Sequence, residues 1–134
     1  MVIDTMVFAY ALLRVEGFHQ ESLSVFSKAS EILVPDSFRS ELANVVWQWI
    51  KVRGVALNVG INVLRDADSL VTQVISSASL WERALTLSVA NNHAAYDTLF
   101  IALAERFNTK VVTYDAQLYK IFPENVITPS DFLR

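Results

Sequence analysis

The chain has 134 residues, no cysteine and a formal net charge of −3. This length predicts one domain covering residues 1–134. The 53% share of hydrophobic residues excludes a disordered or fibrous chain. The acidic balance argues against a protein that coats nucleic acid through a broad basic surface. It does not exclude an enzyme that acts on nucleic acid, because bound divalent cations offset the charge of an acidic cleft.

No segment predicts a membrane span or a signal peptide. The two longest uncharged stretches, Ser69–Trp81 and Ala84–Tyr96, have 13 residues each, and a spanning helix needs about 18 or more. Asp4 interrupts the N-terminus before any basic region or long apolar run. The absence of cysteine excludes disulfides and thiolate metal sites and fits a cytoplasmic protein. We therefore expect the protein in the cytoplasm.

In the first half of the chain, short apolar runs alternate with helical patterns. Gly17 interrupts the first helical pattern, and Pro35 stops a strand because proline cannot donate a ladder hydrogen bond. Asp36 or Ser37 is a typical N-cap, and Gly54 marks a helix end. The predicted elements are a strand at Val2–Ile3, helices at Met6–Leu13 and His19–Ala29, a strand at Glu31–Val34, a helix from Asp36 or Ser37 to about Arg53, and a helix at Leu57–Leu64.

The second half continues the alternation. Asp66 and Asp68 are expected in a solvated loop, and Lys110–Thr113 is of the β-branched type found in buried parallel sheets. The predicted elements are a strand at Val71–Ile75, helices at Leu80–Ala90 and from about Ala94 to Phe107, a strand at Lys110–Thr113, a helix at Ala116–Ile121 and a strand at Val126–Ile127. This order predicts an α/β fold, a three-layer α/β/α sandwich with a mostly parallel central sheet. Ligands of such sheets bind outside the carboxyl ends of the strands.

Four acids stand at the ends of apolar elements. Asp4 follows the first strand, Glu41 opens ELANVVWQWI, and Asp115 follows KVVTY. Asp97 is the only charged residue in Ala84–Ala104, and an unpaired buried charge costs several kcal/mol or more. Clustered carboxylates repel one another, and a divalent cation relieves that repulsion. Oxygen ligands suit Mg²⁺ or Mn²⁺, which can bind a phosphate oxygen and lower the pKa of an attacking water. The pattern predicts metal-dependent hydrolysis.

At these residues the chain resembles the PIN-domain family, and more closely its small single-domain toxins of toxin–antitoxin systems. The matching blocks are VIDT at 2–5, SELANVV at 40–46, AAYDTLFIALAERF at 94–107, VVTYDAQL at 111–118 and the closing VITPSDFL. The third block is the most specific of the five. The resemblance implies a PIN-like fold and a Mg²⁺- or Mn²⁺-dependent endoribonuclease that cuts RNA phosphodiester bonds by metal-activated water. It also implies a homodimer, and inhibition by a small cognate antitoxin whose tail enters the cleft.

The resemblance assigns roles to individual residues. Asp4, Glu41, Asp97 and Asp115 would be the catalytic, metal-site acids, and Thr113 would support the last of them. The family often has a small polar residue where this chain has Met6, and Thr5 is the candidate to replace its hydrogen bond. On the face of Glu41, Asn44 and Gln48 form either a solvated row or a cleft wall that touches substrate.

Other interpretations remain open. Asp4 could cap a helix, Asp97 could be a first-turn acid, Asp115 a turn residue and Glu41 a solvated one. His93 is expected to cap or pack at a helix start. At the level of function, one alternative is a PIN-like protein-binding module with weak or no nuclease activity. The other is a receiver-like phosphoacceptor, which needs an acidic pair near the first strand and a lysine after a late strand.

Overall fold

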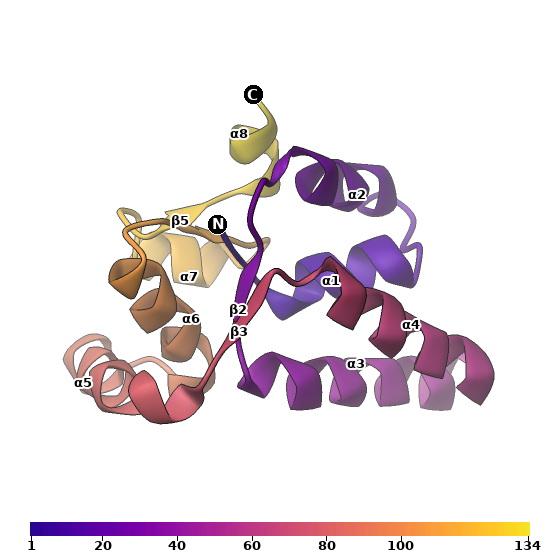
Figure 1. The fold of residues 1–134 in the computed structure, drawn as a ribbon, viewed down its shortest axis with the longest axis horizontal. Coiled ribbons are helices and arrows are strands. Elements are labelled where there is room, and N and C mark those ends of the chain that lie inside the picture. Colours follow the sequence, from indigo (N-terminus) through magenta and orange to yellow (C-terminus); the bar gives the residue numbers. More distant parts are fainter.

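Five parallel strands form one central sheet in the order β3-β2-β1-β4-β5 (Figure 1). The structure, a computed structural model, describes all 134 residues. The strands are β1 (Val2–Ile3), β2 (Leu33–Pro35), β3 (Gln73–Ile75), β4 (Val111–Val112) and β5 (Val126–Ile127). The predicted α/β fold with a parallel sheet is confirmed.

Helices cover both faces of the sheet (Figure 1). One side carries α1 (Thr5–Leu12), α2 (His19–Lys28), α3 (Ser37–Arg53) and α4 (Leu57–Leu70). The other side carries α5 (Trp81–Asn91), α6 (Ala95–Arg106) and α7 (Ala116–Ile121). The short α8 (Pro129–Leu133) packs against α2, and a 3₁₀ turn spans Ser77–Ser79. None of these helices is both long and apolar enough to cross a membrane.

The core lies on both sides of the central strands. Val2 and Ile3 of β1 and both residues of β4 have no solvent exposure, as expected for strands covered on both faces. On the α1 side, the ring of Phe8 packs between Phe26 and Phe38, with centroid distances of 4.7 and 4.9 Å. This packing anchors α1, and with it the residue at its N-terminus, against the sheet.

Two predictions about elements were wrong. Helix α4 continues to Leu70 instead of ending at Leu64, because Val63 and Ala67 extend its buried face by one more turn. Asp66 and Asp68 therefore lie on a helix, and Asp68 forms an exposed ion pair with Arg39 at 2.8 Å.

Helix α8 was not predicted. Pro129 begins it, and the Thr128 side chain caps it by accepting a hydrogen bond from the Asp131 amide at 3.1 Å. Pro129 and Thr128 are both start signals, since proline suits the first helical position and threonine the N-cap. The helix has only five residues.

The central position of β1 determines where a site can form. The chain continues from β1 to β2 on one side, and β4 pairs with β1 on the other. The sheet therefore extends from β1 first through β2 and β3 in one direction and later through β4 and β5 in the other. In parallel sheets, a crevice opens where the strand order reverses in this way, outside the carboxyl ends of the strands. The pairing of Ile3 with Val112 brings the residues that follow, Asp4 and Thr113, side by side.

Candidate active site

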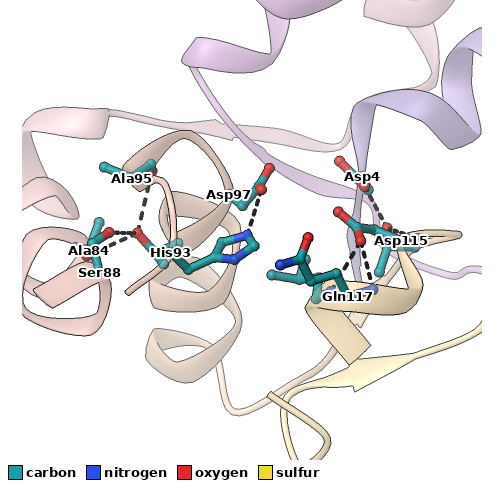
Figure 2. A network of polar contacts seen from close by, with 11 residues as sticks. Asp4, Ala84, Ser88, His93, Ala95, Asp97, Asp115 and Gln117 are labelled. Carbon is teal, nitrogen blue, oxygen red and sulfur yellow. Dashed lines mark hydrogen bonds and ion pairs between the residues drawn. The ribbon is translucent and has the colours of Figure 1, made fainter. Parts of the chain in front are cut away.

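The four predicted acids line one pocket of about 290 Å³ at the carboxyl ends of β1 and β4. Asp4 comes from the end of β1, Glu41 from α3, Asp97 from the start of α6 and Asp115 from the segment after β4. Figure 2 shows Asp97 across the pocket from Asp4 and Asp115. No lysine or arginine lines this pocket.

Asp4 is held by both neighbouring segments. Its Oδ1 accepts a hydrogen bond from the Thr5 amide at 2.8 Å and so caps α1. Its Oδ2 accepts one from the Thr113 hydroxyl at 2.5 Å. Burial raises the pKa of Asp4 from 3.8 to about 6, and the charges of Asp97 and Asp115 add to the rise against the two hydrogen bonds. Asp4 therefore caps α1 and also lines the acid pocket, so the two roles considered for it from the sequence are compatible.

Glu41 has one bonded and one unbonded oxygen. The Thr5 hydroxyl donates to its Oε2 at 2.8 Å, whereas its Oε1 is buried without any hydrogen-bond partner. Burial raises the pKa of Glu41 from 4.5 to about 7, and the charges of Asp4 and Asp97 raise it further, against the hydrogen bond from Thr5. A buried carboxylate oxygen without a partner is costly, so this atom is suited to an added proton, water or cation.

Asp97 lies in the first turn of α6, where the helix dipole favours an anion. Its side chain is 41% exposed, and its Oδ2 lies 2.7 Å from Nε2 of His93 (Figure 2). The His93 ring is only 8% exposed and packs edge-on against Phe122. His93 thus does pack at the helix start, and it also holds the carboxylate of Asp97.

The start of α6 is also fixed to α5. The buried Thr98 hydroxyl donates to the carbonyl oxygen of Ala84 at 2.9 Å and lies 2.8 Å from the Ser88 hydroxyl (Figure 2). Because Thr98 follows Asp97 directly, these bonds fix the backbone that presents the carboxylate.

Asp115 caps α7 and is tied to Asp4 through one threonine. Its Oδ1 accepts hydrogen bonds from the amides of Gln117 and Leu118 at 2.9 and 3.1 Å. Its own amide donates to the Thr113 hydroxyl at 3.0 Å, the same hydroxyl that donates to Asp4. Thr113 therefore fixes the spacing of these two acids.

The carboxylates converge on the pocket without forming a ready-made coordination shell. No three acidic or histidine side chains lie close enough together to hold one ion. The carboxylate of Asp97 contacts the ring of His93, and the carboxylate of Asp115 accepts hydrogen bonds from the amides of α7.

The donor set nevertheless fits Mg²⁺ or Mn²⁺. The charged groups that line the pocket are all carboxylates, which are the ligands that these hard cations prefer. Mg²⁺ keeps several waters and needs only one or two direct carboxylate ligands. Glu41 Oε1 has no other partner, so it is available to the ion or to one of its waters.

The wall of the pocket differs in part from the expectation. Asn44 and Gln48 are exposed and do not line the pocket, which fits the solvated row and not the cleft wall, whereas Val45 does line it. Val45 is four residues from Glu41, so it shares the pocket face of α3. Tyr10 and Tyr114 also line the pocket and were missed. The available signal was the position of Tyr114, directly before Asp115.

We expect His93→Ala to lower the affinity of the pocket for Mn²⁺ by roughly 10- to 100-fold, the usual effect of removing a partner that orients a ligand. The physical reason is the loss of the 2.7 Å bond that holds Asp97 Oδ2. Calorimetric titration with Mn²⁺ measures the affinity. His19→Ala, at the only other histidine, is the control. Equal Mn²⁺ affinity in His93→Ala and wild type would contradict the orienting role.

Known proteins resemble this chain in sequence and in fold. The chain is 28% identical over 131 residues to Ribonuclease VapC3 of Pyrobaculum aerophilum, covering 96% of this chain and 98% of that protein. Its fold is similar to that of the crystal structure of PAE2754 from the same organism. The TM-score is 0.74 at 15% identity, over 98% of this chain and 90% of that chain. It is also similar to a chain in a toxin–antitoxin complex from Klebsiella pneumoniae. There the TM-score is 0.66 at 17% identity, over 96% of both chains.

The PIN domain family matches residues 1–122, which is most of the chain. The match includes β1, β2, β3 and β4, the first four strands of the sheet, and all four acids of the pocket. The resemblance seen in the sequence is confirmed, and the chain belongs to the PIN-domain family.

Proposed function

We propose that the protein is a Mg²⁺- or Mn²⁺-dependent endoribonuclease and the toxin of a toxin–antitoxin pair. The observation that carries the proposal is the convergence of Asp4, Glu41, Asp97 and Asp115 on one pocket, where Glu41 Oε1 has no partner. The relative that covers nearly the whole chain is named a ribonuclease, which supports RNA as the substrate. The receiver-like alternative has no support from the family match.

In the proposed mechanism Asp4, Glu41 and Asp97 would hold the cation directly or through water, with Asp115 as the fourth acid. When bound, the cation stabilises charge on the phosphate and lowers the pKa of a water. Thr5 and Thr113 orient Glu41 and Asp4, and His93 orients Asp97.

Hydrolysis then joins a water oxygen to phosphorus in line with the bond that breaks in the RNA strand. Asp115 lines the same pocket and in this mechanism would help bind the cation or orient that water. The chain therefore supplies position and charge, and it needs no nucleophilic side chain.

The proposed partners are a small antitoxin, a second copy of this chain and RNA in the cytoplasm. The structural similarity to a chain of a toxin–antitoxin complex supports the first. The second is supported by exposed apolar side chains on one stretch of α5, where Trp81, Leu85 and Val89 are each more than half exposed. Apolar residues gathered in this way are typical of an interaction surface.

The test is cleavage of a mixed, structured RNA by the purified protein with Mg²⁺, with Mn²⁺ and with EDTA. We expect cleavage in the presence of either cation and none in EDTA, because the pocket offers only carboxylates as charged groups. Cleavage that persists in EDTA would contradict the proposed metal dependence. If no RNA is cleaved and calorimetry detects no Mn²⁺ binding, the protein-binding module becomes the better hypothesis.

A further inference from the structure

Three aromatic rings from separate segments form a contiguous group beside the acid pocket. Tyr10 lies on α1, Phe18 directly before α2, and Tyr114 between β4 and Asp115. Tyr10 stacks on Phe18 at a centroid distance of 4.5 Å, and Tyr114 lies 5.2 Å from each of the other two. We call these three residues the aromatic cluster.

The aromatic cluster is not part of the closed core. Phe18 is 38% exposed, and Tyr10 and Tyr114 are only partly buried. The Tyr114 hydroxyl lies 2.8 Å from that of Ser22, which is fully buried, so this ring is anchored. Exposed rings held in a fixed arrangement are suited to stacking against a flat ligand.

The aromatic cluster continues the wall of the acid pocket. Tyr10 and Tyr114 line that pocket together with the four acids. A phosphate held among the acids by a cation would therefore have its neighbouring nucleoside beside these rings.

The electrostatics of the region favour a neutral ligand over a second phosphate. No lysine or arginine lines the pocket, so inside the pocket the contacts to RNA other than those through the cation are non-ionic. Stacking of bases on aromatic rings provides such contacts.

We propose that the aromatic cluster stacks an unpaired nucleobase adjacent to the phosphate that the acid pocket takes. The substrate class is then RNA with a single-stranded or looped segment at the cut, because a base paired within a helix must first be unpaired and unstacked before it can reach the rings. Stacking tolerates any base, so the cluster selects for an unpaired nucleotide more than for one sequence. This inference rests on the proposed ribonuclease function.

The experiment compares Phe18→Leu and Phe18→Trp with wild type. Leucine keeps an apolar side chain without a π-face, and tryptophan restores the face. Phe107→Leu is the matched control, because Phe107 is also 38% exposed but lies at the end of α6, away from the pocket. The substrates are a single-stranded RNA and the same RNA with one abasic nucleotide beside the cleaved bond. Binding is measured separately with 2-aminopurine in that place, since stacking quenches its fluorescence.

We expect Phe18→Leu to raise KM roughly tenfold or more with little change in kcat, and Phe18→Trp to restore KM. The abasic RNA should show the same loss with wild type and no further loss with Phe18→Leu. The 2-aminopurine quench should persist in Asp97→Asn, which leaves the rings intact, and disappear in Phe18→Leu. A wild-type KM in Phe18→Leu, or additive losses from the variant and the abasic RNA, would overturn the inference.

If the proposed ribonuclease function is wrong, the cleavage and binding experiments give a different pattern. If wild type cuts no RNA in Mg²⁺ or Mn²⁺, the ribonuclease proposal fails, and the quench experiment still decides the inference. A quench that depends on Phe18 supports a base-stacking surface, and RNA binding that does not need Phe18, or no binding, overturns it. If a protein partner, and not RNA, binds the aromatic cluster, RNA binding will not depend on Phe18.

Discussion

Asp97→Asn should reduce metal-dependent RNA cleavage by more than about 100-fold, since loss of a partner that only orients a ligand already costs roughly 10- to 100-fold. Asparagine has nearly the same shape as aspartate but removes the negative charge that attracts the cation. The fold should survive, because the side chain is 41% exposed and the backbone around it is fixed by Thr98. Initial rates at saturating Mg²⁺ and thermal melting in EDTA measure the two effects.

The matched control for Asp97→Asn is Asp66→Asn. Asp66 is an exposed helical aspartate on α4 that does not line the acid pocket. It should keep wild-type cleavage, so that a loss in Asp97→Asn alone reports on the pocket. If both variants cut RNA as well as wild type, the activity comes from another site or from a contaminant.

In EDTA, the free energy of unfolding should fall as the pH rises from about 4 to about 8. The folded protein raises the pKa of Asp4 from 3.8 to about 6 and that of Glu41 from 4.5 to about 7, in both cases chiefly through burial. Between the unfolded and folded values the folded state binds more protons than the unfolded state, so stability decreases with pH in this window. Thermal melting across this pH range measures the effect.

Mg²⁺ should reverse this loss, most clearly at pH 8, where both carboxylates are ionised. A cation present at about 100 times its Kd adds about 2.7 kcal/mol to the free energy of unfolding.

Glu41→Gln should melt roughly 3–6 °C above wild type in EDTA at pH 8, because it removes the ionisable carboxyl whose Oε1 is buried without a partner. It should also lose most of the Mg²⁺ effect. A wild-type melting temperature that rises with pH in EDTA would contradict the prediction.

Much of this fold and its site could be predicted from local sequence. Val2–Ile3 and Val111–Val112 are apolar, β-branched runs of the type found in buried parallel strands. Each is followed within a few residues by an acid. Because the carboxyl ends of parallel strands meet at one edge, the acids Asp4 and Asp115 were expected together, and the structure places both in the acid pocket.

The partners of those acids could not be predicted in the same way. Thr5 was expected to support the site in place of Met6, but the sequence did not show that its hydroxyl donates to Glu41 on α3, 36 residues away. Asn44 and Val45 are adjacent in sequence, and only Val45 reaches the pocket. That choice depends on how α3 is rotated against α1 and α4, which results from the packing of many side chains.

The sequence by itself determined the family, the order of the strands and of every helix except α8, and the choice of the four acids as candidates, because these depend on short patterns of burial, capping and charge. Only the tertiary structure decided that His93 holds Asp97, that Thr113 joins Asp4 to Asp115, and that Tyr10, Phe18 and Tyr114 meet beside the pocket. The physical reason is that hydrogen bonds and ring contacts require positions correct to a fraction of an ångström. Residues distant in the chain reach such positions only when the sheet register and the packing of the helices are in place.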